Sequence, residues 1–315
     1  MSKKSPTKLA FIIGHYKSGS TWLSHALALH PDVRSMHEMH IFRYLKESSD
    51  FNEAVHRLFN TSSWGNKGTS SFLRNYMARS TRVFRKLLHL SKGTATLPTE
   101  QIPNRAQDLG LYNYFRLKMI LRNSSSKEDF LNKLFTFLSR RVKHGEYIIE
   151  KTPTNIFEVD AIKNYFPNAK LISIHRDGRD VAVSDRYHIR RVHGTERSIK
   201  ESAEHWKQAM DAEMNACKDN SIFQASYEEM QNDPDTLLKN LLIYLELDHS
   251  PEIIREMIYK SSFKFATGGR NKGSADANNF RRKGIVGDWK NELTDQEINI
   301  INEVAGELLT EFNYK

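Results

Sequence analysis

The chain reads Leu9-Ala10-Phe11-Ile12-Ile13 and continues Gly14-His15-Tyr16-Lys17-Ser18-Gly19-Ser20-Thr21-Trp22. The five apolar residues predict a buried strand, and the residues that follow predict an apolar helix carrying Leu23, Ala26, Leu27 and Leu29. The glycine-containing turn between them leads into the helix N-terminus, where free backbone N–H groups and the helix dipole attract anions. Lys17 adds a positive charge, and Ser18, Ser20 and Thr21 add hydroxyl donors. The stretch therefore predicts an anion site, with a surface turn of small polar residues as the alternative.

Other short apolar runs alternate with helix-like segments along the chain. We expect strands at 9–13, 147–149, 171–174 and 222–226 and helices over 128–142 and 196–217. A further helix begins at Asn232-Asp233-Pro234, because capping side chains and a first-turn proline precede leucines at helical spacing. Near-continuous apolar strands between helices are typical of a parallel sheet covered on both faces. The sequence therefore predicts a single α/β domain over residues 1–315.

Two segments interrupt this alternation. Residues 50–127 hold scattered aromatic and basic residues without sustained periodicity, and we interpret them as a mostly helical insertion. Residues 266–288 combine glycines with cationic side chains, namely Gly268, Gly269, Gly273, Gly284 and Gly287 with Arg270, Lys272, Arg281, Arg282 and Lys283. Such a composition is typical of a mobile basic loop.

The composition limits the partners and the compartment. A formal net charge of +9 favours an anionic partner, which leaves nucleic acid, anionic lipid, acidic polysaccharide and a polyphosphorylated cofactor open. No nucleic-acid-binding signature is present, so we expect no nucleic-acid partner. Cys217 is the only cysteine, which excludes an intrachain disulfide and favours the cytoplasm. No stretch approaches the roughly 18 apolar residues that a membrane span needs.

Three separated motifs resemble those of the sulfotransferases that use 3′-phosphoadenosine 5′-phosphosulfate (PAPS). The run from Lys17 to Trp22 resembles the family's 5′-phosphosulfate loop. The segment from Arg176 to Ser184 resembles its 3′-phosphate motif, in which the leading arginine and the last serine hold the phosphate. Without the resemblance, Arg179 and Asp180 would form an ion pair in the first turn of a helix. The segment 280–290 resembles Arg-Lys-Gly-x-x-Gly-Asp-Trp-Lys, which places Arg282, Lys283 and Gly284 over the same phosphate. The resemblance implies a fold like the P-loop nucleotide kinases and sulfuryl transfer from PAPS to a hydroxyl or amine, with 3′-phosphoadenosine 5′-phosphate (PAP) as product.

Two weaker matches concern the adenine. Tyr227-Glu228-Glu229 and Ser261-Ser262-Phe263 resemble family segments whose Tyr and Phe approach the ring, and Trp22 would form the other wall. For each of these aromatic residues, packing in the core is an alternative of equal weight to contact with the adenine. The resemblance also implies that the 50–127 insertion shapes the acceptor site and that the 266–288 loop orders around the 3′-phosphate.

The catalytic residues implied by the resemblance come from two branches of the family. Lys17 would steady the leaving phosphate oxygen, and Lys151, in a Lys-Thr-Pro segment like that of the heparan-type enzymes, would be the second lysine. Glu38 takes the position of the heparan-type base, with His40 or His37 as alternatives, whereas the 280–290 loop looks like that of the cytosolic enzymes. Without the resemblance, Glu38 would be an ion-pair partner of Arg43 or Lys46.

Several questions stay open at the level of the sequence. The spacing of His37 and His40 is one residue short of a zinc-binding His-Glu-x-x-His helix, so we expect no metal. Lys17 precedes the second glycine of its turn, which disfavours the alternative of a nucleotide-dependent kinase. A non-catalytic protein that binds polyanions is the other alternative. The resemblance implies a carbohydrate, a lipid or a small molecule as the acceptor and leaves open which of these it is.

The family's C-terminal dimer segment is only partly present, which favours a monomer or weak dimer.

Overall fold

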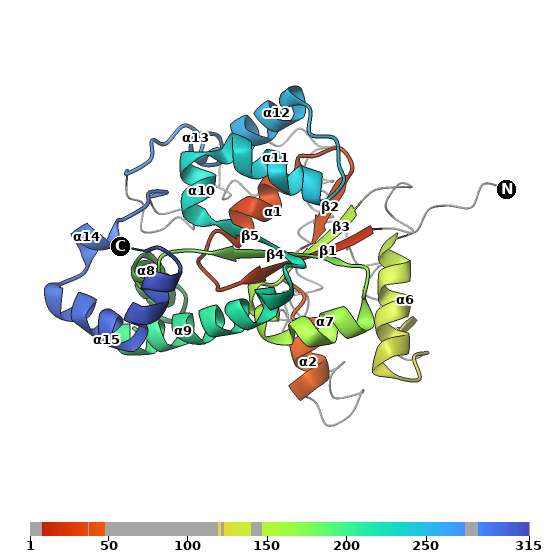
Figure 1. Cartoon of the computed structure of the whole chain (residues 1–315), viewed down its shortest axis with the longest axis horizontal. Coiled ribbons are helices and arrows are strands. Elements are labelled where there is room, and N and C mark those ends of the chain that lie inside the picture. The colour runs from red at the N-terminus through yellow and green to blue at the C-terminus, as the bar shows by residue number, and fades with distance from the viewer. Residues whose placement is uncertain are drawn as a thin grey trace, which may run out of the picture.

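A parallel five-stranded sheet forms the centre of the computed structural model, which describes residues 8–36, 38–47, 119–120, 123–139, 147–274 and 283–314. The strand order is β2-β3-β1-β4-β5 (Figure 1). The strands are β1 (Lys8–Gly14), β2 (Val33–Met36), β3 (Tyr147–Lys151), β4 (Lys170–His175) and β5 (Ile222–Ser226). Every neighbouring pair runs parallel. The predicted α/β fold is confirmed, and β2 is the strand that sequence reasoning missed.

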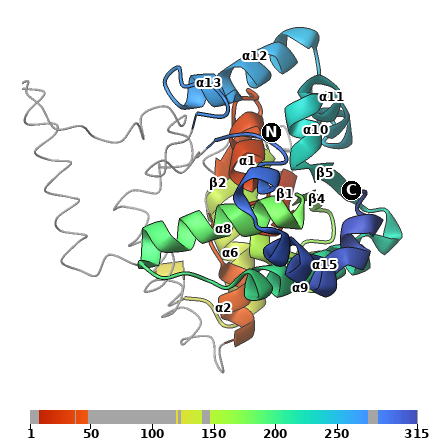
Figure 2. The same ribbon diagram turned by 90° about the vertical axis from the view of Figure 1, so that its left-hand side faces the viewer.

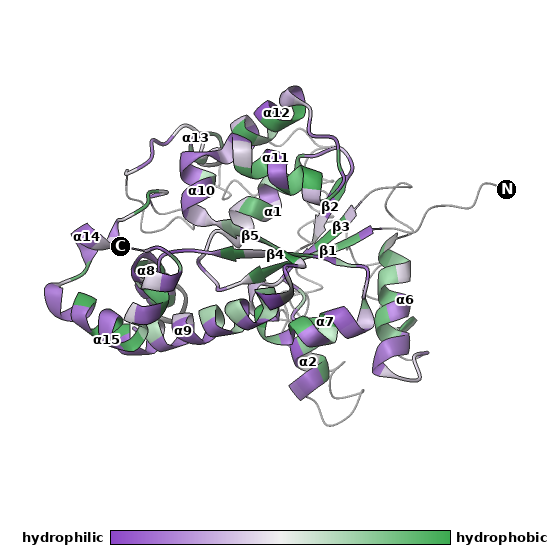
Figure 3. Cartoon of the chain, in the orientation of Figure 1, coloured by the Kyte–Doolittle hydropathy of each residue, from purple (hydrophilic) through white to green (hydrophobic). Residues whose placement is uncertain are grey.

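The central strand β1 divides the core in two because its side chains alternate between the faces of the sheet. Ala10 and Ile12 pack against helices α1, α10, α11 and α12, whereas Phe11 and Ile13 pack against α2, α6, α7, α8, α9 and α15. Figures 1 and 2 show these two groups of helices on opposite sides of the sheet. The strands are apolar and the outer helix faces are hydrophilic (Figure 3), as a sheet buried on both faces requires.

The predicted helices at 128–142 and 196–217 correspond to α6 and α9, and the helix predicted after Asp233 is α11. Side chains cap two of them: Ser198 accepts from the backbone N–H of Glu201 at the start of α9, and Asp233 accepts from that of Thr236. The helices are α1 (Ser20–Ala28), α2 (Ile41–Glu47), α6 (Lys127–Ser139), α7 (Val159–Tyr165), α8 (Gly178–His193), α9 (Ile199–Ala216), α10 (Tyr227–Asn232), α11 (Pro234–Tyr244), α12 (Pro251–Ser261), α13 (Phe263–Ala266), α14 (Trp289–Glu292) and α15 (Asp295–Glu311), with 3₁₀ turns η2 (Pro153–Glu158) and η3 (Cys217–Asp219).

The two irregular segments are described only in part. Most of the predicted insertion at 50–127 lies outside the described residues. Of the 266–288 loop, residues 266–274 and 283–288 are described, and the backbone N–H of Gly273 donates to the Lys283 carbonyl at 2.9 Å. The two described ends of the loop therefore lie together, and its mobility stays a prediction. Among the described residues, no helix is long and apolar enough to cross a membrane.

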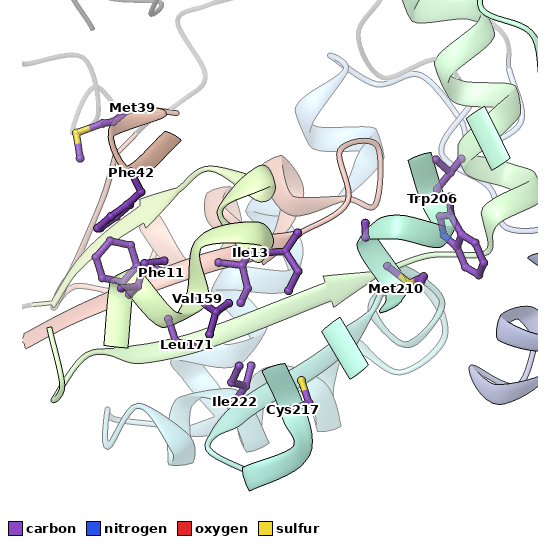
Figure 4. Close-up of a cluster of buried hydrophobic side chains, with 14 of the residues drawn as sticks. Phe11, Ile13, Met39, Phe42, Val159, Leu171, Trp206, Met210, Cys217 and Ile222 are labelled. Carbon is purple, nitrogen blue, oxygen red and sulfur yellow. The ribbon is translucent and has the colours of Figure 1, made fainter. Parts of the chain in front are cut away.

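Phe11 belongs to the larger apolar cluster, where it lies next to Phe42 (Figure 4). Its ring centroid is 5.7 Å from that of Phe42, 6.0 Å from Phe135 and 5.9 Å from Phe166, and its side chain is fully buried. These contacts join β1 to α2, α6 and the end of α7. Replacement of this ring should therefore open a cavity between the sheet and three other elements.

We predict that Phe11→Ala lowers the free energy of unfolding by about 3–5 kcal/mol, because it loses buried aromatic area and leaves a cavity. Urea unfolding followed by circular dichroism measures this. The control is Phe157→Ala, since the Phe157 side chain is 46% exposed, and its effect should stay within roughly 0.5 kcal/mol. Equal losses for the two variants would contradict this account of the core.

Candidate active site

All five strands end at the same edge of the sheet, because they are parallel. Residues that the sequence singles out lie at each carboxyl end. Gly14 ends β1 and Lys151 ends β3, whereas Glu38, Arg176 and Tyr227 follow β2, β4 and β5. In open α/β sheets, ligands bind outside the carboxyl ends of the strands. The topology therefore brings residues from distant parts of the chain to one edge.

The turn after β1 depends on Gly19. Its φ of 91° lies in the left-handed region, and a Cβ atom there would lie 2.6 Å from the ring of Tyr227. The Gly19 carbonyl accepts from the backbone N–H of Trp22 at 2.8 Å and of Leu23 at 3.0 Å, which starts α1. Lys17 also has a positive φ, of 68°. The backbone is thus bent so that the predicted anion loop lies directly against Tyr227.

A pocket at this edge is lined by residues of all three predicted motifs. The predicted donor-binding residues that line it are Lys17, Gly19, Ser20, Thr21, Trp22, Arg176, Ser184, Tyr227, Phe263, Lys283 and Gly284. Ser18 is fully buried and is not among the lining residues. Arg282 lies outside the described residues. The structure therefore brings the described members of the three motifs together, as expected if they bind one ligand.

Aromatic side chains form part of the pocket wall. Trp22 and Tyr227 meet edge to face with ring centroids 5.6 Å apart, and the guanidinium of Arg176 lies 4.1 Å from the Tyr227 ring centroid. Phe263 also lines the pocket, and a Cβ atom on Gly284 would lie 2.3 Å from its ring. Flat apolar surfaces of this kind suit a nucleobase. All three aromatic residues also have a packing role.

Asp180 ties the C-terminal segment to this pocket. Its fully buried carboxylate accepts from the backbone N–H groups of Gly287 at 2.8 Å and Trp289 at 3.0 Å, and from Arg176 Nη2 at 3.2 Å. Arg176 Nη2 also donates to the Ile285 carbonyl at 3.0 Å. Asp180 and Arg176 together therefore fix the segment that carries Lys283 and Gly284.

The ion pair between Arg179 and Asp180, expected without the family resemblance, does not form. Arg179 pairs with Asp177, and Asp180 pairs with Arg176. Arg179 makes a two-pronged bond to Asp177, with Nη2 2.8 Å from Oδ2 and Nε 3.0 Å from Oδ1. Its guanidinium also lies 4.0 Å from the ring centroid of Trp289. The reason is geometric: Asp177 caps α8 and lies beside Arg179, whereas Asp180 is directed toward the pocket.

Lys283 is held by two carboxylates. Its Nζ donates to Asp288 at 2.9 Å and to Glu292 at 2.6 Å. Both Lys283 and Asp288 line the pocket. A bound phosphate would therefore compete with these carboxylates for the ammonium group.

Three buried polar atoms at the site have no hydrogen-bond partner among the described residues. They are Ser18 Oγ, Trp22 Nε1 and Arg176 Nε. Unsatisfied buried polar groups are rare and costly in folded proteins. All three can donate a hydrogen bond, so the site fits a polyanionic ligand with many acceptor oxygens.

Glu38 lies beside the pocket in a cluster with Lys151 and His40. Lys151 Nζ donates to Glu38 Oε1 at 2.5 Å and to Thr21 Oγ1 at 3.4 Å. His40 Nε2 lies 3.5 Å from Glu38 Oε2. Thr21 lines the pocket, so contacts lead from the pocket to the predicted base. His37, the other candidate base, lies outside the described residues.

The environment of Glu38 favours its charged form. Burial acts to raise its pKa, but the hydrogen bond with His40 and the charge of Lys151 outweigh burial and lower the pKa to about 2. Glu38 is therefore a carboxylate at neutral pH and a weak base as long as Lys151 stays paired with it.

The alternative partners of Glu38 are engaged elsewhere. Arg43 pairs with Glu47 at 2.6 Å, and Lys46 pairs with Glu158 at 3.1 Å. The interpretation of Glu38 as their ion-pair partner is therefore wrong.

Glu150 is a buried acid next to this cluster. Burial raises its pKa to about 7, although hydrogen bonds from Thr152 and the Met39 backbone and electrostatic interactions with Lys151 and His40 act to lower it. The sequence analysis did not single out Glu150. One pattern could have indicated it, because this glutamate directly follows the apolar run Tyr147-Ile148-Ile149 of a predicted strand.

Other members of the site were also missed. Gln231 Nε2 donates to Tyr227 Oη at 3.0 Å and to the Gly284 carbonyl at 3.3 Å. Asp180 and Asp288 line the pocket although an anion site favours cations. No local pattern indicates the contact between Gln231 and Gly284, because these residues lie 53 positions apart. Within the described ranges, no group of three or more His, Cys, Asp or Glu side chains could hold a metal ion.

The parallel sheet with an anion loop after its central strand defines a nucleotide-binding class of α/β protein. Residues 10–251 match the model of the sulfotransferase family, and the chain belongs to that family. It is 28% identical over 199 residues to sulfotransferase 1 family member D1 of Rattus norvegicus, a match that covers 56% of this chain and 64% of that protein.

Solved structures share the fold. The sulfotransferase domain from the curacin biosynthetic pathway has a TM-score of 0.59 and 16% identity, over 97% of this chain and 98% of that one. Mouse sulfotransferase SULT7A1, solved in complex with PAP, has a TM-score of 0.54 and 17% identity, over 98% of this chain and 86% of that one. At these identities the likeness shows a common fold.

We predict that Gly284→Ala weakens PAP binding at least tenfold, because the added Cβ would meet the Phe263 ring and displace one wall of the pocket. The matched control is Gly287→Ala. Gly287 also has a positive φ, of 75°, but no atom lies within 4 Å of its would-be Cβ. Isothermal titration calorimetry with PAP compares the two variants, and a similar loss of affinity in both would show that backbone strain, not the Phe263 contact, is responsible.

We also predict that Glu150→Gln changes the pH dependence of stability. A carboxyl whose folded pKa is raised stabilises the fold below its unfolded pKa and loses that contribution as pH rises through the folded value, here about 7. Glutamine cannot ionise, so the variant should gain stability over the wild type between pH 5 and pH 8, by up to about 3 kcal/mol. Urea unfolding at both pH values measures the gain, and a difference that does not change with pH would refute a buried ionisation at Glu150.

Proposed function

We propose that the protein transfers a sulfuryl group from PAPS to an acceptor hydroxyl or amine by in-line displacement and releases PAP. The observation that carries this proposal is a pocket at the carboxyl edge of the sheet, which gathers residues of three motifs that are widely separated in the sequence. Membership of the sulfotransferase family supports the same reaction.

Different residues would hold different parts of the donor. The 5′-phosphosulfate would be bound by backbone N–H groups, hydroxyls and one ammonium group from Lys17, Ser18, Gly19, Ser20 and Thr21. The 3′-phosphate would lie between Arg176, Ser184 and Lys283, and the adenine between Trp22, Tyr227 and Phe263. An arginine suits this position because its planar fork bonds a phosphate through two parallel N–H groups.

The arrangement of Lys151 suggests how the base is activated. When bound, PAPS supplies the sulfuryl group and a stable leaving group. Lys17 would neutralise charge on the leaving oxygen, and Glu38 would accept the proton of the acceptor. Because Lys151 lies between Glu38 and Thr21, an anion in the pocket competes with Glu38 for this ammonium group. As that ion pair weakens, the pKa of Glu38 rises and the carboxylate becomes a stronger base.

The finer aspects of the function are also proposals. We propose that the acceptor is a carbohydrate, a lipid or a small molecule, that no metal takes part in the reaction, and that neither nucleic acid nor a stable oligomer is needed. The cytoplasm remains the predicted location, from the single cysteine at position 217.

Calorimetry tests the donor site directly. We expect the wild type to bind PAP at least tenfold more tightly than AMP, and Arg176→Ala to lose this preference because the 3′-phosphate loses its two-pronged partner. A protein that binds ATP as tightly as PAP would favour the kinase alternative. Equal affinities for PAP and AMP would refute the assignment of this pocket to the donor.

Glu38→Gln separates chemistry from binding. We expect turnover to fall by roughly 10²- to 10⁴-fold, since the amide cannot accept the proton, while the affinity for PAP changes less than threefold. The assay follows transfer of radiolabelled sulfate from PAPS to a panel of phenols, sugars and lipid alcohols. Arg43→Gln serves as the control, because Arg43 pairs with Glu47 outside the pocket, and its activity should match the wild type. Full activity in Glu38→Gln would exclude Glu38 as the base.

A further inference from the structure

The buried carboxylate of Glu150 gathers hydrogen bonds from two separate parts of the chain. Its side chain is 1% exposed. Oε1 accepts from the backbone N–H of Met39 at 3.1 Å, a residue 111 positions away, and from the hydroxyl of Thr152. Oε2 accepts from Asn155 Nδ2 at 3.0 Å. The strand β3 and the turn that follows it are thereby joined to the segment between β2 and α2.

The Glu150 carboxylate also sets the direction of the Thr152 hydroxyl. Thr152 Oγ1 donates to Glu150 Oε1, so the hydroxyl proton points toward Glu150 and the oxygen lone pairs point elsewhere. Thr152 Oγ1 in turn accepts from the backbone N–H of Met39 at 3.0 Å and of His40 at 3.4 Å. Glu150 and Thr152 therefore hold two successive backbone amides of the same short segment.

That segment carries two of the proposed catalytic side chains. Glu38 and His40 flank Met39, whose side chain is buried, and His40 has a φ of 52°, in the left-handed region that non-glycine residues rarely adopt. Such a conformation persists only where surrounding contacts fix it. The next residue of β3, Lys151, bonds Glu38 itself. Strand β3 thus fixes the Glu38 segment in two ways. Glu150 holds the backbone N–H of Met39, and Lys151 holds the carboxylate of Glu38.

Stability alone does not favour a glutamate at this position. Burial opposes ionisation of Glu150 and raises its pKa to about 7, so the ionised form costs stability near neutral pH. Electrostatic interactions with Lys151 and His40 act to lower the pKa of Glu150, and both residues belong to the proposed site. A costly buried group whose contacts lead to a catalytic segment is typical of a residue kept for function.

We propose that Glu150 is a positioning residue for sulfuryl transfer, which acts through Thr152 and the backbone amides of Met39 and His40 to hold Glu38 in place. This inference rests on the proposed function of Glu38. It assigns Glu150 no contact with the donor or the acceptor.

The test compares three variants with two readouts. Glu150→Leu removes the acceptor, and Thr152→Val removes the hydroxyl with little change of shape. Glu150→Gln preserves the network, because the amide oxygen still accepts from Met39 and Asn155 can turn its amide to accept through Oδ1, an atom with no partner among the described residues. Ile149→Val is the control, since Ile149 lies on the same strand but packs in the cluster on the other face of the sheet.

The first readout is amide hydrogen exchange at Met39 and His40, which needs no acceptor. We expect exchange at least tenfold faster in Glu150→Leu and Thr152→Val, with wild-type exchange in Glu150→Gln and Ile149→Val. Unchanged exchange in both disruptive variants would overturn the proposal. If Glu150→Leu does not fold, Thr152→Val decides the same point.

The second readout compares turnover with PAP affinity. We expect kcat to fall at least tenfold in the two disruptive variants, with PAP affinity within twofold of the wild type, and Glu150→Gln to keep kcat within threefold. Faster exchange with unchanged kcat, or an equal loss of PAP affinity, would also overturn the proposal. A wild type that transfers no sulfuryl group would instead refute the proposed function, while the exchange readout would still show whether Glu150 holds the segment.

Discussion

The site depends on one constraint, the parallel alignment of all five strands about β1. Parallel strands deliver every following turn to the same edge, so residues from the whole described chain meet there without a second domain. The constraint is tight at Gly14, where φ is 139° and a Cβ atom would lie 2.2 Å from the Ile174 carbonyl oxygen of β4. Only glycine lets the anion loop leave β1 so close to its neighbour. The pocket follows from this arrangement of backbone, and the side chains then determine what it binds.

Three cations of the site are paired with carboxylates of the same chain. Arg176 pairs with Asp180, Lys283 with Asp288 and Lys151 with Glu38. These pairs keep charged groups in place at a partly buried edge where isolated charges would be costly. Under the proposed function, a polyanionic donor competes for the same ammonium and guanidinium groups. Donor binding would then change the pairing of Lys151, and with it the basicity of Glu38, so that the proton acceptor becomes strong only when the donor is present.

Much of this organisation could be predicted from the sequence, because the strands β1, β3, β4 and β5 are local apolar runs and the three motifs are local patterns. The short strand β2 was missed, since Val33-Arg34-Ser35-Met36 has no continuous apolar character. Local patterns also predicted the wrong partners for Arg179 and, in the alternative interpretation, for Glu38. The contacts of Asp180 with Gly287 and of Glu150 with Met39 could not be predicted, because each joins residues more than one hundred positions apart. Tertiary structure alone shows that these carboxylates hold the backbone of the site.

A crystal structure of the protein with PAP tests the central claim most directly, namely that one nucleotide donor occupies the edge where the three motifs meet. The account predicts the 3′-phosphate against Arg176, Ser184 and Lys283, the 5′-phosphate on the backbone N–H groups at the start of α1, and Lys283 drawn away from Asp288. PAP bound elsewhere, or bound with its 3′-phosphate away from Arg176, would contradict it.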